Sequence, residues 1–550
     1  MQKGELNKFP YFRIAMKATY IDYSETNSFS STALSYLSRD PKLRPFIFDF
    51  PSVENFGKLI KSKTVTANRE VLVKVLKRQY SVLEAESDEL KAKNLVLSNI
   101  ELLSQPNTYT ITTGHQLNIF TGPLYFIYKI VTAINLAREL KQSYPEKNFV
   151  PVYWMATEDH DFAEINHISL HGKPIVWEQD NRGATGRLPT STIASAVKAF
   201  QNLLGISKNS EKLSTLIEEA YINHSHLADA TRHLVNGLFA EHGLVIVDAD
   251  NHELKKQFAG IITEDILNKN SSRIIGQTSK NLEDAGFSTQ VNAREINFFY
   301  MADGLRERII EENGVFSVLN TDIRFTEEQI KEEITLYPER FSPNVIMRPL
   351  YQEVILPNLA YIGGGAEIVY WLQLKDNFDF YKAGFPLLLL RNSALITDES
   401  FSGKLCRLHI KLKDLFKNTE TLQKEWVLTH SQHTLTLASE KSEFEAIFQK
   451  IKLRTYKIDP TLAPSAEAVN ARLKKALGNL EQKLVKAEKK NHEGALSQIE
   501  SLRSKYFPGG GLQERSENFG IFYVKYGDQF ISELIRHFKP LDFKFTILEP

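Results

Sequence analysis

Short runs of apolar residues that lead directly into polar ones are the most regular pattern in this chain. Residues 109–112 and 148–156 are two such runs and predict β-strands, while the segment between them, 124–140, carries apolar side chains at helical spacing. A strand, a helix and a second strand in this order form the βαβ unit of a parallel sheet, whose crossover is right-handed. The pattern therefore predicts an α/β protein built on a parallel sheet.

Two more apolar runs predict further strands of the same sheet. Residues 244–247 and 387–390 are these runs, and polar residues again follow the carboxyl end of each. The long, mixed intervals near 172–230 and 265–340 predict insertions that wall in a substrate cleft. The order of the strands in the sheet does not follow from the sequence.

Helical patterns dominate both sides of this core. Charged and apolar positions alternate at helical period over residues 68–104, and a lysine- and glutamate-rich helical region fills residues 401–506. In the second region five residues repeat in alternating steps of four and three, as in a coiled-coil seam: Leu473, Leu477, Leu480, Leu484 and Ala487. This seam predicts a coiled-coil arm that pairs either with residues 420–452 of the same chain or with another subunit.

The predicted organisation has four parts. An N-terminal helical section precedes the sheet core, the coiled-coil arm follows it, and an aromatic C-terminal segment packs back on the core. Their predicted boundaries are 1–105, 106–400, 401–506 and 507–550.

Composition and charge narrow the class of protein. A chain of 550 residues with 42% hydrophobic and 24% charged positions is ordinary for a globular protein of more than one domain. Lysine plus arginine equals aspartate plus glutamate at 67 each, so no global basic field attracts nucleic acid or an anionic membrane. The single cysteine, Cys406, cannot form an intrachain disulfide, and the first residues lack the apolar stretch of a signal peptide. We therefore expect a cytoplasmic protein with no nucleic-acid or membrane partner.

The loop after the first predicted strand is the first candidate for chemistry. Gly114 and Gly122 bracket it, and a glycine-bearing loop before a helix start exposes backbone N–H groups that favour phosphate or carboxylate. His115 and Gln116 are placed to donate to phosphate oxygens or to a developing oxyanion, so we predict an anion-binding site with a functional role here. The alternative is an ordinary βα turn with a capping histidine.

Four residues after the second strand form the next candidate cluster. Glu158, Asp159 and Asp161 surround His160, so the carboxylates would hold the imidazole charged or fix its tautomer. We predict His160 and Asp161 as catalytic acid–base groups and Glu158 and Asp159 as substrate ligands. A capping role for the acidic residues remains the simpler alternative.

The third candidate is the glycine-rich segment 363–365. Three glycines let a ligand approach the backbone, and Glu367 and Tyr370, three residues apart at a helix start, would face that ligand together. A carboxylate there suits an amine-bearing ligand. A flexible turn that feeds a packed aromatic helix is an equally good interpretation of these residues alone.

Together, several segments resemble the bacillithiol-biosynthesis cysteine-adding enzyme family. The motifs occur in the family's order and span essentially the whole chain. Two positions differ from the family's pattern: His115 stands where many members carry glutamine, and Gly364–Ala366 stands where they carry glycine-proline-glycine. The matching segments are Thr113–Gln116, Gly122–Tyr125, Pro151–Trp154, Glu158–Phe162, Arg348–Leu350, Gln352–Glu353, Gly363–Trp371 and Phe507–Arg515.

The resemblance implies a fold, a reaction and partners. It implies a Rossmann-like core of the class I nucleotidyl-transferase type with connecting insertions, a coiled-coil arm and a homodimer, for which that arm is the expected interface. The implied reaction joins cysteine to glucosaminyl malate and completes bacillithiol, with cysteine activated by ATP. The expected cofactor is ATP or ADP, and by the same resemblance His115 is catalytic and the nucleotide is bound by Gly114, His115, Gln116 and Gly122. We assign no metal ligands. The expected substrate-binding residues are Glu158, Asp159, Arg348, Gln352, Tyr361, Glu367 and Tyr370.

Two other classes of protein remain open. A metal-dependent hydrolase would use His160, Glu164 and His167, which lie near one face if the segment is helical, with a second acidic group at 248–252. A coiled-coil scaffold would use a degenerate core only to bind a nucleotide.

Overall fold

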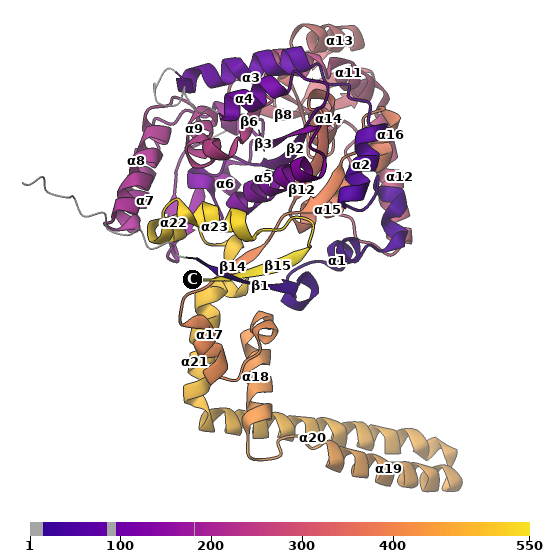
Figure 1. Cartoon of the computed structure of the whole chain (residues 1–550). Helices are drawn as coiled ribbons and strands as arrows, with labels where there is room; N and C mark the ends of the chain where they lie inside the picture. Colours follow the sequence, from indigo (N-terminus) through magenta and orange to yellow (C-terminus); the bar gives the residue numbers. More distant parts are fainter. Residues whose placement is uncertain (1–14, 85–94, 181) are drawn as a thin grey trace, which may run out of the picture. The chain divides into compact units, whose positions relative to one another are not determined.

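The computed structural model describes residues 15–84, 95–180 and 182–550. These residues form two compact units (Figure 1). Unit 1 contains the described residues up to Ser24 together with Ser28–Ile396 and Leu512–Pro550, and unit 2 contains Glu25–Asn27 and Thr397–Gly511. In the sequence, most of unit 2 is therefore an insertion between two segments of unit 1.

A five-stranded parallel sheet forms the centre of unit 1. Its strand order is β13, β12, β2, β3, β6, and every neighbouring pair is parallel. Four of these strands are the predicted ones, but β12 was not recognised because its short apolar run merges into a glycine-rich turn. The bounds are β2 (Thr108–His115), β3 (Asn148–Met155), β6 (Val245–Asp248), β12 (Asn358–Gly363) and β13 (Leu387–Leu390).

The strand order contains a reversal of direction. The chain passes from β2 to β3 and β6 on one side, then returns to place β12 and β13 on the other side of β2. In open α/β sheets, ligands bind beyond the carboxyl ends of the strands where such a reversal occurs. The fold therefore directs attention to the ends of β2 and β12.

The helix after β2 covers one face of this sheet. Helix α5 (Tyr125–Ser143) has buried residues on all sides. It lies against the sheet and also contacts the C-terminal segment, where its Asn135 amide donates to the carbonyls of Ile535 and Phe538 at 2.8 Å. Its Leu136 and Leu140 share a core cluster with Phe56 of α2 (Val53–Ser62) and with residues of β2, β12 and β13. The prediction of a helix over 124–140 is confirmed.

Alternation along β2 explains which residues face this core. Ile111 belongs to the apolar cluster, whereas the hydroxyls of Thr110 and Thr112, on the opposite face, donate to the Asn358 amide oxygen at 3.1 and 2.8 Å. The threonines are fully buried, so these bonds satisfy polar groups that would otherwise be costly.

The two intervals expected to be insertions contain their own structure. The second holds most of a five-stranded antiparallel sheet, in the order β10, β9, β8, β7, β11, which the sequence pattern did not predict. Its strands are β7 (Phe298–Ala302), β8 (Leu305–Glu312), β9 (Val315–Val318), β10 (Arg324–Phe325) and β11 (Phe341–Pro343). Other elements in or next to these regions are β4 (His167–Leu170), β5 (Lys173–Val176), α7 (Ala194–Leu204), α8 (Lys208–Ile222), α9 (Leu227–Phe239), α10 (His252–Lys256), α11 (Ala259–Asn268), α12 (Asn270–Asp284) and α13 (Glu327–Leu336).

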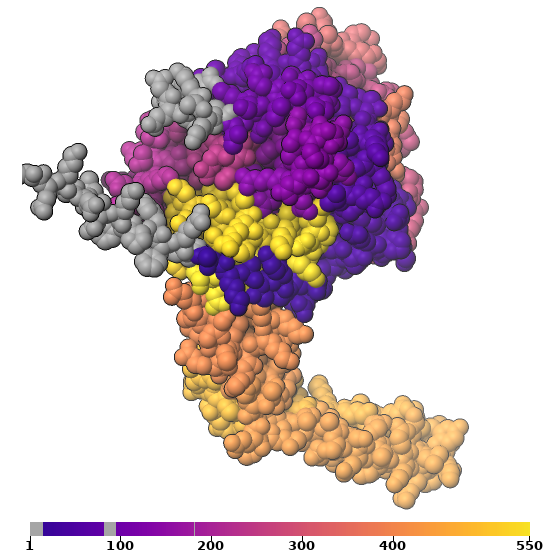
Figure 2. Space-filling view, in the orientation of Figure 1, coloured from indigo at the N-terminus to yellow at the C-terminus, as the bar shows by residue number. Residues whose placement is uncertain are grey.

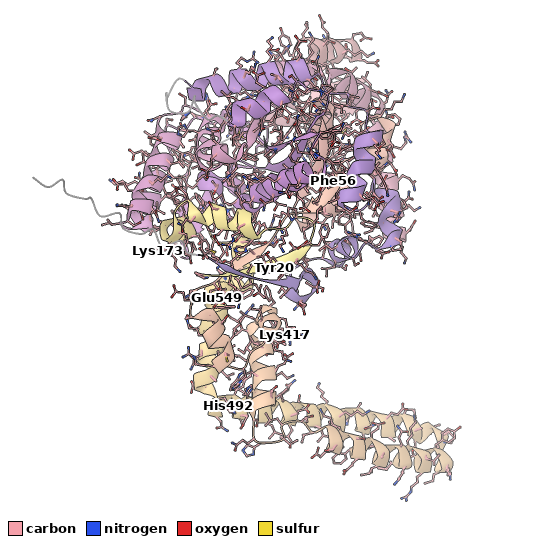
Figure 3. All side chains as sticks on the ribbon, viewed as in Figure 1. Tyr20, Phe56, Lys173, Lys417, His492 and Glu549 are labelled. Atoms are coloured by element: carbon pink, nitrogen blue, oxygen red, sulfur yellow. The ribbon has the colours of Figure 1, made fainter. Side chains whose placement is uncertain are left out.

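The C-terminal segment of unit 1 meets its N-terminal segment. Strand β15 (Lys544–Glu549) lies between β1 (Lys17–Asp22), antiparallel to it, and β14 (Ala394–Ile396), parallel to it. Figure 3 labels Tyr20 and Glu549 on the paired β1 and β15, and Figure 2 shows the yellow C-terminal residues against the indigo N-terminal ones. Two helices precede β15: α22 (Gly520–Tyr526) and α23 (Gln529–His537).

The N-terminal section is helical for the most part. Helices α3 (Arg69–Glu84) and α4 (Leu95–Leu102) fall in the stretch predicted to be helical, and the residues between them lie outside the described part of the chain. The section also contains β1, a strand that the sequence pattern did not predict and whose alternating half-buried positions suit an edge strand. A further helix, α1 (Ser31–Leu37), starts at the side-chain cap of Ser30.

Unit 2 is helical, and its longest helices pair within one chain. Helices α19 (Ala438–Ile458) and α20 (Ala463–Asn491) form a hairpin, with ion pairs from Glu445 to Lys474 at 2.5 Å and from Lys441 to Glu481 at 2.6 Å. The predicted coiled-coil arm thus pairs with part of residues 420–452. The other helices are α17 (Phe401–Arg407), α18 (Thr419–His430), whose N-cap follows the labelled Lys417 of Figure 3, and α21 (Glu493–Tyr506).

The predicted seam of this arm needs a correction. Leu480 is 48% exposed and Ala487 is also exposed, whereas Val485, outside the predicted seam, is buried. Different stretches of α20 pack against different helices, α19 and α18, so a single heptad register does not describe all its contacts.

In the described part of the chain no helix is long and apolar enough to cross a bilayer.

Candidate active site

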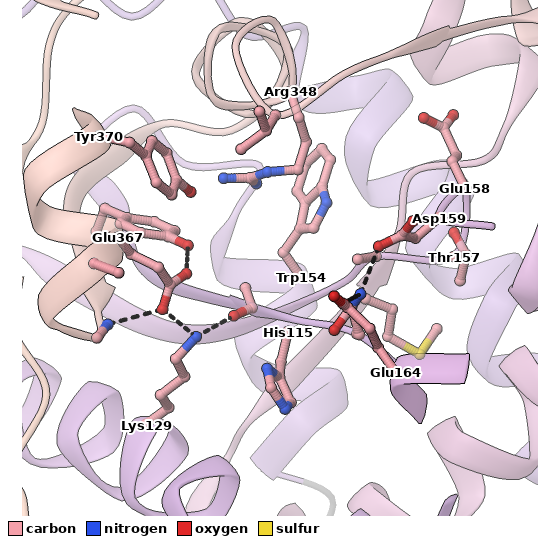
Figure 4. A pocket seen from close by; sticks show the side chains of 18 of the residues that line it. His115, Lys129, Trp154, Thr157, Glu158, Asp159, Glu164, Arg348, Glu367 and Tyr370 are labelled. Carbon is pink, nitrogen blue, oxygen red and sulfur yellow. Dashed lines mark hydrogen bonds and ion pairs between the residues drawn. The ribbon is translucent and has the colours of Figure 1, made fainter. Parts of the chain in front are cut away.

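A cavity of about 620 Å³ opens beyond the carboxyl ends of β2, β3 and β12 (Figure 4). It lies where the strand order reverses, which is the position expected for a ligand site in an open α/β sheet. Helix α15 (Gly365–Trp371), helix α14 (Arg348–Ile355) and the antiparallel sheet supply further walls. All the lining residues belong to unit 1.

His115 lies at the end of β2, between aromatic rings. Its ring centroid is 5.4 Å from that of Tyr125 and 5.2 Å from that of Phe126. Burial, together with the nearby charge of Lys129, lowers the pKa of His115 to about 3. The imidazole is therefore neutral at physiological pH, so it offers a hydrogen-bond donor rather than a positive charge.

A buried ion pair forms one wall of the cavity. The ammonium group of Lys129 on α5 contacts the Glu367 carboxylate at 2.5 Å and donates to the Gly114 carbonyl at 2.9 Å. The same carboxylate accepts from the Tyr361 hydroxyl at 2.6 Å and from the Gly364 amide at 2.8 Å, as the dashed lines in Figure 4 mark. Burial raises the pKa of Glu367, but Lys129 and these donors outweigh burial and lower it. Glu367 is thus ionised and fully engaged.

Arg348 lies in the same cavity without a carboxylate partner. Its guanidinium group is 5.8 Å from the Trp154 ring and 5.6 Å from the Tyr361 ring, and its Nη1 donates to the Gln352 amide oxygen at 3.0 Å. Its Nη2 is buried and has no hydrogen-bond partner among the described residues. A buried, unpartnered guanidinium nitrogen in a cavity is a site for a carboxylate or phosphate.

The opposite end of the cavity is acidic. The Gln116 amide donates to Asp159 at 2.7 Å and to Glu164 at 2.8 Å, which holds the two carboxylates side by side. Burial raises the pKa of Asp159, but hydrogen bonds from His160 and Gln116 and the charge of Arg306 outweigh burial and lower it well below its usual range. Two carboxylates in this position suit an ammonium group.

Arg306 determines the state of His160. A guanidinium has no acceptor, so the 2.7 Å contact from Arg306 Nη1 to His160 Nδ1 requires an unprotonated Nδ1. The proton of the neutral ring is then on Nε2. Arg306 itself stacks on Phe299, with its central carbon 4.1 Å from the ring centroid. The contact with Arg306 thus selects one tautomer of His160, and a fixed tautomer was one of the two predicted possibilities.

A second ionic network lies behind the acidic end. Glu158 pairs with the fully buried Lys255, whose ammonium group also donates to the Phe341 carbonyl at 2.9 Å. The Thr157 hydroxyl donates to Asp248 at 2.6 Å, and burial together with the charge of Asp250 raises the pKa of Asp248 to about 6. This network fixes the ends of β3 and β6.

The structure brings most of the predicted site residues together. Nine of them line the cavity: Gly114, His115, Gln116, Glu158, Asp159, Arg348, Tyr361, Glu367 and Tyr370. Four others do not line it: His160, Asp161, Gly122 and Gln352.

The residues outside the lining have other local roles. Gln352 is buried behind Arg348, and Asp161 is exposed at the N-cap of α6 (Phe162–Ile165) without making a side-chain cap bond. Gly122 has φ +66°, and a Cβ there would lie 2.6 Å from the Asn118 Cβ, so the turn requires glycine. Its carbonyl accepts from Asn518 at 2.7 Å.

Sequence reasoning missed several residues of the cavity. Lys129 carried a usable signal, because it is a lone charge within a buried apolar run of α5. Arg306 carried none, since it lies in an insertion whose strands were not predicted. Tyr125 and Arg515 also line the cavity and were named only as ends of larger segments, and Arg391, another lining residue, directly follows a predicted strand.

The residues expected for a metal-dependent hydrolase do not come together as a metal site in the described part of the chain. Among the residues that the structure describes, no group of three His, Cys, Asp or Glu side chains is placed to hold a metal ion. His167 is exposed on β4, and His160 faces the positive charge of Arg306, which disfavours a cation there. This alternative is not favoured.

Two family models together match nearly the whole chain. The family model described as "Bacillithiol biosynthesis BshC, N-terminal Rossmann-like domain" matches residues 16–392. The model described as "Bacillithiol biosynthesis BshC, C-terminal coiled-coil domain" matches residues 394–550.

Similar curated proteins cover nearly the full length. Proteins of Flavobacterium psychrophilum and Flavobacterium johnsoniae are each 44% identical over 97% of this chain and 100% of their own length. A protein of Cytophaga hutchinsonii is 36% identical over 96% of this chain and 98% of its own. All three carry the name "Putative cysteine ligase BshC".

Proposed function

This chain belongs to the bacillithiol-biosynthesis BshC family, and on that premise we propose that it is a cysteine ligase that joins L-cysteine to glucosaminyl malate. The family and the ligase class agree with the resemblance seen in the sequence. The substrates and the source of energy are the further steps of the proposal.

One observation supports the proposal most strongly: the cavity has opposite charges in separate, fixed places. Arg348 offers an unpartnered guanidinium nitrogen, while Asp159 and Glu164 offer neighbouring carboxylates. Glucosaminyl malate carries carboxylates and an amine, and cysteine carries one of each, so both substrates need acceptors and donors in one cavity. Arg348 would take a substrate carboxylate, and the acidic pair would take a substrate ammonium group.

Amide formation from a carboxylate requires activation. We propose that ATP activates cysteine: the cysteine carboxylate attacks the α-phosphorus, pyrophosphate leaves, and a cysteinyl adenylate forms. The glucosamine amine then attacks the acyl carbon, AMP leaves, and the amine loses a proton. The neutral His115 would donate a hydrogen bond to phosphate or to the developing oxyanion.

The proton acceptor in this scheme differs from the one the sequence indicated. His160 carries its proton on Nε2 while Nδ1 accepts from Arg306, and Asp161 lies outside the cavity lining. Glu164 lines the cavity beside the proposed ammonium site, so we propose Glu164 as the acceptor.

A product assay tests the reaction. The full chain is incubated with cysteine, glucosaminyl malate and ATP, and the mixture is analysed by mass spectrometry for bacillithiol and for AMP or ADP. We expect bacillithiol and AMP in equal amounts, with Glu164→Gln slow and the exposed Glu332→Gln at the wild-type rate. Equal product without nucleotide would remove the adenylate step, and no product under any condition would remove the function.

We also propose a cytoplasmic homodimer that associates through the arm. Support comes from α19, which has no buried residue and leaves apolar side chains exposed along one face, such as Ile447 at 49%, Ile451 at 39% and Ile458 at 81%. An apolar stripe of this kind favours a protein partner. Light scattering should give twice the chain mass, and Ile447→Glu should give the single-chain mass.

A further inference from the structure

Arg515 reaches the cavity from the C-terminal segment of unit 1. The chain on both sides of it is fixed: Glu514 is fully buried and accepts from Arg391 Nη2 at 2.7 Å and from the Ala394 amide at 3.0 Å. The Asn518 amide donates to the carbonyls of Phe120 and Gly122 at 2.8 and 2.7 Å. The backbone that carries Arg515 is therefore anchored to the end of the sheet and to the loop after β2.

The side chain of Arg515, by contrast, is exposed. It lines the cavity and makes no hydrogen bond or ion pair with any residue that the structure describes. Ordering a long side chain costs conformational entropy, so a fixed backbone that presents a free guanidinium group to a cavity gains nothing for folding. Such an arrangement fits a ligand-binding group.

Two more donors lie in the same part of the cavity, around Tyr125. Arg391 is 3% exposed, its guanidinium carbon is 5.1 Å from the Tyr125 ring centroid, and its Nε has no partner among the described residues. His115, whose ring contacts Tyr125, has a buried Nε2 that also lacks a partner. Burial raises the pKa of Tyr125, while the charges of Arg391 and Arg515 both lower it, as expected if both are near its hydroxyl.

Two of the nearby carboxylates are already engaged, and the third, Glu164, forms no ion pair with Arg515 in the described part of the chain. Glu514 is occupied by Arg391 and the Ala394 amide, and Glu367 is occupied by Lys129, Tyr361 and the Gly364 amide. Neither is therefore available to neutralise Arg515. The charge of Arg515 is left for a ligand.

We propose that Arg515, Arg391 and His115 form a subsite for a phosphate group, the terminal phosphates of a nucleotide or pyrophosphate itself. Three donors from three separate segments suit the several terminal oxygens of a phosphate better than the two of a carboxylate. The proposal deepens the proposed function, on whose nucleotide step it rests. It assigns to the C-terminal segment a direct part in ligand binding.

Calorimetric titration of the full chain tests this subsite directly. Pyrophosphate, ADP and L-malate are titrated separately, without cysteine or acceptor, into wild type, Arg515→Ala, Arg515→Lys and the control Arg536→Ala. Arg536 is also exposed and lies in the same unit, on α23. Since Arg515 has no partner, Arg515→Ala should keep the wild-type Tm.

The expected result is a selective loss of phosphate binding. Arg515→Ala should weaken pyrophosphate and ADP by about 10- to 100-fold, the loss of one charge-assisted contact. Arg515→Lys should bind with intermediate affinity, Arg536→Ala should bind as wild type, and L-malate should bind equally to all four proteins.

Three results would overturn the proposal. They are unchanged pyrophosphate and ADP affinity in Arg515→Ala, a loss for L-malate that equals the loss for pyrophosphate, and no binding of pyrophosphate or ADP to wild type. Because no ligation is measured, a protein that binds phosphate through Arg515 but makes no bacillithiol would refute the proposed function and leave the subsite standing.

Discussion

Helices α5 and α19 are similar in length, 19 and 21 residues, but their surroundings are opposite. Helix α5 has thirteen buried residues, Lys129 among them, whereas α19 has none. A charge in a fully enclosed helix must have a partner, and Lys129 has Glu367. Apolar side chains on an open helix, such as Ile451 at 39% exposure, contribute little until something covers them. Helix α5 therefore belongs to a region built around a site, whereas α19 forms part of an open surface.

Removing the buried charge of α5 should have the largest effect on stability. Lys129→Met leaves Glu367 without its cation in a cavity wall, so the free energy of unfolding should fall by about 4 kcal/mol. Urea denaturation measures this loss.

A double variant sharpens this prediction. Lys129→Met with Glu367→Gln removes both charges and should recover more than half of the loss, because no uncompensated charge remains. If the double variant is no more stable than Lys129→Met, the pairing does not account for the charge in α5.

The next largest difference in stability between the two helices should come from truncating an apolar residue. Ile130 on α5 is fully buried, so Ile130→Ala should lower the free energy of unfolding by about 3 kcal/mol through lost packing and a cavity. Ile451→Ala on α19 removes a side chain that is 39% exposed and should cost less than about 1 kcal/mol. Equal losses in urea denaturation, at a concentration where light scattering gives the single-chain mass, would contradict the comparison.

Carboxylates in the two regions should respond differently to pH. Burial and Asp250 raise the pKa of Asp248 from 3.8 in its unperturbed state to about 6. At Asp248 the folded state then binds more protons than the unfolded state between these values, so the contribution of this group to stability is greatest below about pH 4 and is lost as pH rises to 6. The loss is about 3 kcal/mol for a shift of this size.

Asp248→Asn should remove this fall in stability between pH 4 and 6. The matched variant is Glu445→Gln on α19, where ion pairing with Lys474 lowers the pKa of a surface carboxylate to about 2. Chemical unfolding of both variants at pH 4, 5 and 6 measures the effect: the fall in stability should disappear in Asp248→Asn and remain in Glu445→Gln. A wild-type profile retained by Asp248→Asn would show that another group is responsible.

The sequence predicted what depends on local pattern. Runs such as 109–112 and 148–156 identified strands, and the polar residues after them identified five residues of one cavity. The glycine-rich segment added Glu367 and Tyr370, and the family resemblance added Arg348 and Tyr361. It did not predict strand order, because pairing β12 beside β2 depends on contacts between distant segments. Arg306 was missed for the same reason, since an arginine in an insertion has no local feature that points to His160.

The predictions for Gly122 and for the coiled-coil seam relied on local patterns, which do not determine tertiary contacts. Gly122 looked like a phosphate-loop glycine, but its conformation serves a turn held by Asn518. Leu480 and Ala487 fitted a heptad, but periodicity alone does not tell which helix covers which residue.

The rate of ligation by Arg348→Ala tests the central claim most directly, that this cavity is the site where the two substrates are joined. The control is Arg308→Ala, an exposed arginine of the same unit on β8. With cysteine, glucosaminyl malate and ATP supplied, the account predicts that kcat/KM for the acceptor falls by about 100-fold in Arg348→Ala, as for a lost charge-assisted carboxylate contact of about 3 kcal/mol. Arg308→Ala should match wild type. Ligation by Arg348→Ala at the wild-type rate would contradict the account.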